Sequence, residues 1–221
     1  MAPVHQRAPH HRTASLRHAR RTTARQTDRV RTLVVAALAA EAAHVPSGLE
    51  VLLTGVGKVA AAVAVTARLA VADRGDLQVV NIGTAGALRP GLEGLFRPSR
   101  VLNHDISAAE LAALGAPTVD ELELAGGDGS VLATGDTFVA DPVLRDELAR
   151  RAHLVDMEGF AVASACAHFG VPIRLVKHVS DTADDSAMSW PAALERSARA
   201  LGAWLGEHVG QPGGAAPPGV P

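Results

Sequence analysis

The 221-residue sequence has a single cysteine, Cys166, and no tyrosine. One cysteine excludes a disulfide framework and a zinc site built on cysteines. Four phenylalanines and two tryptophans leave little surface for stacking bases, which argues against a single-strand nucleic-acid binder. No uninterrupted apolar run reaches the ~18 residues of a membrane span, so no membrane association is expected. With 48% hydrophobic and 20% charged residues, the composition is that of a globular protein of one domain.

Charge is distributed unevenly along the chain. Residues 1–31 carry eight arginines and one aspartate, a net charge of +7, whereas the other 190 residues carry 13 basic and 22 acidic side chains, a net charge of −9. The basic segment has almost no large apolar residues and is predicted to be disordered, as a solvated tail, a basic arm for nucleic acid or acidic lipid, or a transit peptide. The acidic remainder disfavours a nucleic-acid surface elsewhere. The Pro/Gly-rich residues 210–221 are predicted to form a second flexible tail.

Residues 32–209 alternate between short apolar runs and helix-length segments. Strands are predicted at 32–38, 50–54, 77–82, 99–104 and 171–179, and helices at 58–72, 142–151, 158–169 and 191–209. Near-continuous apolar strands separated by helices indicate a sheet covered on both faces. We therefore predict one α/β domain, a three-layer α/β/α sandwich. Ligands of such sheets bind beyond the carboxyl ends of strands.

Two glycine-rich segments follow predicted strands. Residues 54–60 (TGVGKVA) are not a Walker A loop, because Leu52 and Val59 replace its first glycine and its magnesium-binding hydroxyl. They match the looser G-x-G-x-x-A pattern of dinucleotide sites, but such glycines can equally allow tight packing or turn backbone N–H groups toward an anionic or hydroxyl-rich ligand. Residues 81–88 (NIGTAGAL) are predicted to end a strand in a turn that a flat ligand can approach.

Three carboxylates stand where α/β enzymes place functional groups. Asp181 follows the most apolar strand and is a candidate catalytic acid. Glu158 starts a helix, where it serves as a cap or, with Met157, as a sugar-binding pair. Glu41 follows the first strand, with a solvated helix glutamate as the alternative. No second histidine stands at ligand spacing from His104 and no G-x-S-x-G elbow occurs, so we expect neither a metal nor an acyl-transfer nucleophile.

Five segments, taken in order, carry a family resemblance. They are TGVGKVAAA, NIGTAGAL, LATGDTFVA, LVDMEGFAVASAC and HVSDTAD. Together they resemble the nucleoside phosphorylase/nucleosidase superfamily, most of all the 5′-methylthioadenosine/S-adenosylhomocysteine nucleosidases, over about residues 32 to 207. The resemblance implies a sandwich with a mixed central sheet and a cytoplasmic bacterial enzyme. It also implies a homodimer that acts on a purine nucleoside without cofactor or metal.

The resemblance also implies a role for each matching residue. Asp181 would protonate N7 of the purine, Glu41 would activate the attacking water, and Glu158 would bind the ribose 2′ and 3′ hydroxyls. An acid at the leaving purine and a carboxylate-activated water at C1′ meet the two needs of N-glycosidic cleavage. The other substrate-binding positions are Met157 against the sugar, Phe138 and Val139 at the purine, Thr84, Ala85, Gly86 and Ser180 along the cleft, and Trp190 beside the 5′ substituent.

The sequence also departs from both branches of this superfamily. Asn81 stands where the phosphorylases carry an arginine, and LAAEAAHV replaces their arginine-bearing loop, so water is favoured over phosphate as the nucleophile. The segment 42–50 is shorter than in the nucleosidases, the region after Asn103 differs, and Asp156 replaces a glutamate. The 5′ substituent therefore stays open, with futalosine or another purine nucleoside as alternatives. Three other functions stay open: a phosphorylase, an NAD(P)-binding protein using GVGKVA, and a non-enzymatic ligand-binding relative.

Overall fold

The computed structural model describes residues 30–183 and 190–209, with the side chains of residues 190–192 left out. Within these ranges none of the helices is both long enough and apolar enough to cross a membrane. The predicted tails 1–31 and 210–221 fall almost wholly outside the described residues. The elements in chain order are β1 (Arg31–Ala36), β2 (Glu50–Leu53), α1 (Lys58–Ala70), β3 (Leu77–Ala87), β4 (Leu95–Phe96), β5 (Arg100–Asn103), α2 (Ala108–Ala113), β6 (Glu121–Glu123), β7 (Val131–Thr134), α3 (Pro142–Leu148), β8 (Leu154–Asp156), α4 (Gly159–Phe169), β9 (Ile173–Asp181) and α5 (Trp190–His208).

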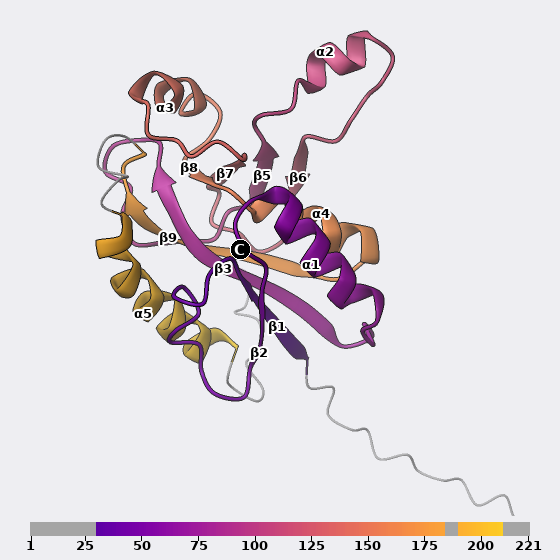
Figure 1. Cartoon of the computed structure of the whole chain (residues 1–221), viewed down its shortest axis with the longest axis vertical. Helices are drawn as coiled ribbons and strands as arrows, with labels where there is room; N and C mark the ends of the chain where they lie inside the picture. Colours follow the sequence, from indigo (N-terminus) through magenta and orange to yellow (C-terminus); the bar gives the residue numbers. More distant parts are fainter. Residues whose placement is uncertain (1–29, 184–189, 210–221) are drawn as a thin grey trace, which may run out of the picture.

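The described strands form one mixed sheet between two helical layers. Their order is β2-β1-β3-β8-β7-β5-β6, with β9 paired to β3 and β4. Helix α5 lies on one face, and α1 and α4 on the other (Figure 1). Strand β1 shows why both faces are covered, since Leu33 and Val35 pack toward α1 and α4 while Val34 and Ala36 pack toward α5. The predicted three-layer α/β/α sandwich with a mixed sheet is confirmed.

Strand β3 changes partners along its length. Its parallel ladder with β1 ends at Asn81, and its antiparallel ladder with β8 begins at Gly86. Strand β9 pairs with the other edge of β3 throughout this stretch. In the described ladders, residues 82–85 therefore have no strand partner on the β1 side. The sheet splits there, at the carboxyl end of β1, and leaves room for a cavity.

The small-residue segment 81–88 does not form the predicted turn. Strand β3 continues through Ala87, because β9 pairs with it as far as Gly86 and β8 pairs with Gly86 and Ala87. The glycines instead let charged side chains approach the strand. A Cβ on Gly83 would lie 3.3 Å from both Oε1 of Glu41 and Nζ of Lys177.

Smaller differences concern element ends and short strands. Strand β1 begins one residue early, inside the predicted tail, because the Arg31 N–H donates to the Asp76 carbonyl at 2.8 Å. Helix α3 ends at Leu148, whereas α4 ends before Gly170, whose φ of 66° fits the predicted C′ glycine. Strands β4, β6 and β7 and helix α2, which are two to six residues long, were not predicted. Cys166 is buried in α4, and this burial raises the pKa of its thiol to about 12.

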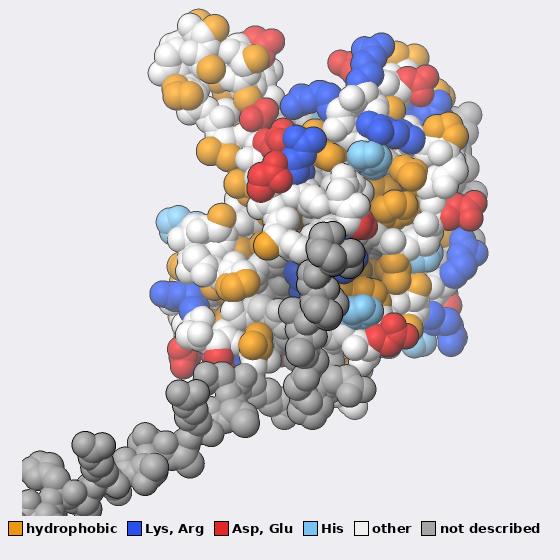
Figure 2. All heavy atoms as spheres, turned by 180° about the vertical axis from the view of Figure 1, so that it is seen from behind, with side chains coloured by type: hydrophobic (Ala, Val, Ile, Leu, Met, Phe, Trp, Pro, Cys, Tyr) orange, Lys and Arg blue, Asp and Glu red, His pale blue; other side chains and the backbone are white. Residues whose placement is uncertain are grey.

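The segment between β5 and β6 projects from the body as an arm (residues 103–121). Figure 2 shows this arm standing apart, with hydrophobic side chains on its surface. Helix α2 buries none of its residues, and Leu114 and Val119 are exposed. The outer part of the arm, from α2 to Val119, thus exposes an apolar surface.

Candidate active site

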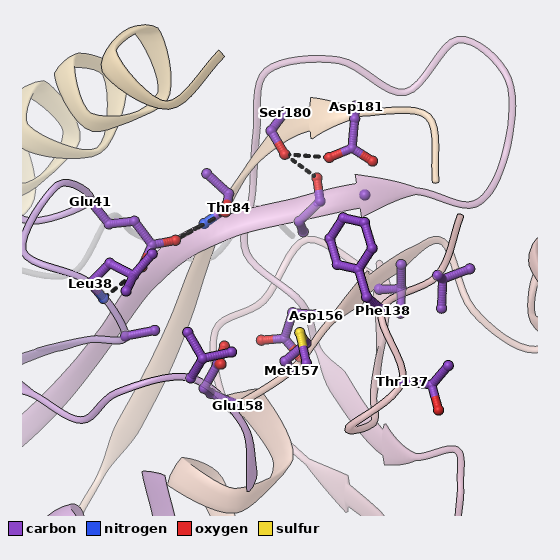
Figure 3. A pocket seen from close by; sticks show the side chains of 16 residues that line it. Leu38, Glu41, Thr84, Thr137, Phe138, Asp156, Met157, Glu158, Ser180 and Asp181 are labelled. Carbon is purple, nitrogen blue, oxygen red and sulfur yellow. Dashed lines mark hydrogen bonds between the residues drawn. The ribbon is translucent and has the colours of Figure 1, made fainter. Parts of the chain in front are cut away.

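A cavity of about 210 Å³ opens where the sheet splits (Figure 3). It lies at the carboxyl ends of β1 and β9, where sheets of this kind bind ligands. Every predicted site residue lines it except Trp190, whose side chain lies outside the described residues. The lining residues are Ala37, Leu38, Glu41, Val56, Thr84, Ala85, Gly86, Thr137, Phe138, Val139, Val155, Asp156, Met157, Glu158, Ser180 and Asp181.

Glu41 is buried against the cavity wall, which overturns the alternative of a solvated glutamate. Its Oε1 accepts hydrogen bonds from the backbone N–H of Thr84 at 2.8 Å and from the Thr84 hydroxyl at 3.0 Å. Its Oε2 accepts one from the Leu38 N–H at 3.2 Å. The Thr84 N–H reaches Glu41 at the split, beyond Asn81, where the ladder with β1 has ended. Three donors therefore hold the carboxylate in one orientation.

Glu158 occupies the N-cap position of α4 without capping the helix. The Gly159 N–H donates instead to Oδ2 of Asp156 at 2.9 Å. This arrangement leaves the Glu158 carboxylate to turn toward the glycine-rich loop, where Oε1 accepts from the Gly57 N–H at 2.7 Å. The structure thus favours a site role for Glu158 over the capping role.

A buried lysine compensates these carboxylates. Nζ of Lys177 lies 2.9 Å from Oδ2 of Asp156, and both side chains are almost fully buried. Burial opposes the charge of Lys177, but Asp156, Glu158 and Glu41 outweigh it and raise the pKa of this lysine. Burial and the charge of Asp156 raise the pKa of Glu158 to about 7, against the lowering effects of Lys177 and the Gly57 N–H. Glu158 is therefore partly protonated near neutral pH.

Asp181 ends β9 beside a bulge. The register with β3 shifts at Gly86, which pairs with Asp181 and leaves Ser180 as an extra residue; such bulges redirect side chains next to functional sites. The Ser180 hydroxyl donates to Oδ2 of Asp181 at 2.7 Å, and the Ala183 N–H donates to Oδ1 at 2.9 Å. The carboxylate is thereby fixed at the edge of the cavity (Figure 3).

The loop after β7 supplies the apolar wall opposite these groups. Phe138 is half exposed at the cavity, whereas Val139 is buried beneath it. Met157 adds a flexible apolar side chain from the β8–α4 junction (Figure 3). A flat aromatic ligand could stack on the exposed ring of Phe138 while polar groups of the same ligand meet the carboxylates.

The glycine-rich loop binds protein carboxylates. The Gly57 N–H donates to Glu158, and the Lys58 N–H donates to Oδ1 of Asp136 at 2.8 Å. Two donors that a dinucleotide phosphate would need are therefore occupied. The geometry therefore disfavours a dinucleotide phosphate at these two N–H groups and shows a function that the sequence did not predict, the positioning of carboxylate side chains.

Sequence reasoning missed two contributors to the site. Lys177 was not predicted, although it is one of only two lysines and follows the apolar residues Leu175 and Val176, a context in which a lysine is buried only when it is paired. The sequence indicates no role for Asp156 beyond the replacement of a glutamate. Lysine within β9 and aspartate within β8 form a pair that only the fold brings together.

Comparisons with known proteins agree on one family. The sequence profile of the phosphorylase superfamily matches residues 129–206. The 5′-methylthioadenosine/S-adenosylhomocysteine nucleosidase of Geobacillus thermodenitrificans is 32% identical over 184 residues, which cover 69% of this chain and 75% of that protein. The aminodeoxyfutalosine nucleosidase of Helicobacter pylori is 36% identical over 106 residues, 47% of this chain and 46% of that protein, so the match spans about half of this relative.

Solved structures share the fold. A 5′-methylthioadenosine/S-adenosylhomocysteine nucleosidase of Helicobacter pylori superposes with a TM-score of 0.70 at 24% identity, over 80% of this chain and 97% of that chain. The corresponding nucleosidase of Neisseria meningitidis gives a TM-score of 0.69 at 21% identity, over 80% and 97%. At these identities the likeness concerns the architecture.

Proposed function

The chain belongs to the phosphorylase superfamily, and on that premise we propose that it hydrolyses the N-glycosidic bond of a purine nucleoside to free base and ribose sugar. One observation carries the proposal. Glu41, Glu158 and Asp181, which come from three distant segments, converge on a single cavity. A non-enzymatic relative would have no need for three carboxylates around one ligand.

Asp181 is proposed as the acid at the leaving group. Cleavage leaves negative charge on the purine, and a proton delivered to N7 neutralises it. Ser180 and the Ala183 N–H hold the carboxyl group in place, so its reach toward N7 is fixed before the substrate binds. Phe138 and Val139 are proposed to hold the purine ring against this acid.

Glu41 is proposed to activate water at C1′. Its carboxylate is fixed by three donors and faces the same cavity as Asp181. Glu158 is proposed to bind the ribose hydroxyls, with Met157 against the sugar and Thr84, Ala85, Gly86 and Ser180 along the cleft. The sugar becomes oxocarbenium-like as the bond breaks, and the surrounding carboxylates stabilise its positive charge.

Water is favoured over phosphate as the nucleophile. Among the described residues that line the cavity there is no arginine or lysine, whereas there are four carboxylates. A phosphate dianion would be repelled unless cations clamped it. Asn81, which stands in place of the phosphorylase arginine, is buried and donates to the Val35 carbonyl at 3.0 Å. Lys177 is already paired with Asp156.

The substrate candidates follow from the names of the relatives. Methylthioadenosine, adenosylhomocysteine and aminodeoxyfutalosine are the nucleosides for which these proteins are named. All three carry a purine and a ribose, which the cavity residues are proposed to bind. The role of Trp190 at the 5′ substituent stays a prediction, as does a cytoplasmic location without cofactor or metal.

A homodimer is part of the same proposal. Val59 and Val63 are exposed one turn apart on α1, and Leu114 and Val119 are exposed on the arm. Apolar surfaces of this kind mark contacts with another protein chain. Sedimentation of the wild type and of a Val59→Asp/Val63→Asp variant tests it, with a dimer expected for the former and a monomer for the latter. A wild-type monomer would refute the proposal.

Two isosteric variants test the assigned roles. Glu41→Gln and Asp181→Asn should each lower kcat by about 100-fold or more, since general acid–base catalysis contributes that much, while nucleoside affinity is retained. Asp146→Asn is the matched control, because this carboxylate is exposed on α3 and does not line the cavity. Near-wild-type hydrolysis by Asp181→Asn would remove Asp181 as the acid. Loss of affinity in Glu41→Gln would make Glu41 a structural residue.

A further inference from the structure

Lys58 makes a dense set of contacts just outside the cavity. Its ammonium group lies 2.8 Å from Oδ1 of Asn103 and 3.8 Å from Oδ2 of Asp136, and it also hydrogen-bonds Oδ1 of Asp105. Its side chain is only 19% exposed. Lys58 does not line the cavity, so it has no role in the proposed catalytic steps.

These contacts join three segments that are far apart in the sequence. Besides the ammonium contacts, the Lys58 N–H donates to Oδ1 of Asp136 at 2.8 Å. The Asp136 N–H in turn donates to Oδ2 of Asp105 at 2.8 Å, which closes the cluster. Lys58 begins α1 at the end of the glycine-rich loop, Asn103 and Asp105 lie at the base of the arm, and Asp136 lies in the loop after β7. We call these four residues the Lys58 clasp.

The clasp depends on the charge of Lys58. One ammonium group faces the carboxylates of Asp105 and Asp136, and among the described ion pairs neither carboxylate has a second cationic partner. Burial disfavours the charge of Asp105, but hydrogen bonds from Lys58 and the Asp136 N–H outweigh it and lower the pKa of Asp105. Without the ammonium group, two neighbouring carboxylates would repel each other.

The clasp is directly connected to the proposed purine site. Asp136 precedes the cavity residues Thr137, Phe138 and Val139 in the chain. On the other side, Gly57 precedes Lys58 and donates to Glu158. Movement of the Lys58 clasp would therefore shift the loop 137–139, which is proposed to contact the purine.

We propose that Lys58 is a positioning residue that holds the loop 137–139 and the base of the arm against the glycine-rich loop, and so sets the affinity for the purine. The proposal rests on the proposed hydrolysis of a purine nucleoside. The loop 137–139 is proposed to contact the purine both before and during bond cleavage. Loss of the Lys58 contacts should therefore weaken binding of the ground state and of the transition state alike.

A charge-removing variant of Lys58 tests the proposal. Lys58→Met should raise KM by about tenfold or more while kcat changes less than about threefold, which is the pattern of lost uniform binding. The matched control is Arg68→Met on the same helix. This variant removes two hydrogen bonds to Glu50, of 2.7 and 2.8 Å, and neither residue lines the cavity. KM should stay at the wild-type value in this control. If the role of Lys58 were merely structural, Lys58→Met would lower the melting temperature without raising KM.

Two rescues sharpen the result. Lys58→Arg keeps the charge and should keep KM within about threefold of wild type. Adding Asp105→Asn to Lys58→Met removes the repulsion between the two carboxylates, so part of the lost affinity should return. An unchanged KM in Lys58→Met, or a KM raised equally in Arg68→Met, would overturn the proposal.

Hydrogen exchange separates this proposal from the proposed function. In Lys58→Met the amides of residues 135–139 should exchange faster than in the wild type and in Arg68→Met. If the wild-type protein cleaves none of the nucleosides tested, the proposed function fails and exchange still decides the role of the clasp. Unchanged hydrogen exchange at residues 135–139 in Lys58→Met would contradict the positioning role of Lys58, whatever the activity of the wild type.

Discussion

The ammonium group of Lys177 lies 2.9 Å from Oδ2 of Asp156, with both side chains shielded from solvent. Asp156 also accepts hydrogen bonds from the Thr134 hydroxyl at 2.6 Å and the Gly159 N–H at 2.9 Å. The pair thus joins β9, β7 and the start of α4 beneath the cavity. The positive charge of Lys177 also interacts favourably with Glu158 and Glu41, which together with Asp156 raise the pKa of this lysine.

Removal of this cation should strongly destabilise the fold. Lys177→Met leaves Asp156 buried without its partner, and breaking a buried ion pair from one side costs about 3–5 kcal/mol. The free energy of unfolding in denaturant measures this loss. Arg100→Met is the control, because both side chains of the Arg100–Glu121 pair remain partly exposed to solvent and the pair should contribute about 1 kcal/mol or less. An equal loss of unfolding free energy in the two variants would contradict the stabilising role of the Lys177–Asp156 pair.

Glu158 should make stability depend on pH. Its pKa is about 7 in the folded protein and 4.5 as the ordinary value, so the folded state binds the proton more tightly. The contribution of Glu158 is therefore most favourable below pH 4.5 and is lost as the pH rises through 7, a change of about 3 kcal/mol at most. Glu158→Gln removes this titration. Its melting temperature relative to the wild type should rise between pH 5 and pH 8.5, and a constant difference would contradict the raised pKa.

Gly86 should be essential for the position of Asp181. A Cβ there would lie 3.0 Å from Oδ1 of Asp181 and 3.0 Å from Cβ of Ala183. Gly86→Ala should displace the proposed acid and lower kcat by about tenfold or more, since catalysis tolerates little misplacement. Gly206→Ala is the control, because a Cβ there meets only Pro46 at 3.8 Å. This variant should keep kcat and gain about 0.5–1 kcal/mol of stability within α5. Full activity in Gly86→Ala would contradict the assigned role.

Much of the layout could be predicted from the sequence. Glu41 and Asp181 were found because catalytic groups follow strands in α/β proteins, and their strands were apolar enough to recognise. The five ordered motifs then placed Glu158 and Phe138 at the same site. The structure brings these residues to one cavity, while their chemical roles stay predictions.

Other features depend on pairing between distant segments. The change of partner along β3 follows from where β8 docks, and the small residues of 81–88 read equally well as a turn or as a strand. The Lys177–Asp156 pair and the Lys58 clasp join residues from different strands and loops, so no local pattern reveals them. The short helix of the arm was also not predicted.

The most direct test of the account is the fate of the solvent oxygen. The protein is incubated in ¹⁸O-labelled water with methylthioadenosine, adenosylhomocysteine, aminodeoxyfutalosine, adenosine, inosine and futalosine, each with and without phosphate. We predict free purine base and a sugar labelled at C1, formed at the same rate in both conditions from at least one of these nucleosides. Cleavage only with phosphate, yielding an unlabelled sugar phosphate, would contradict the hydrolase, and no cleavage of any of them would contradict the proposed function itself.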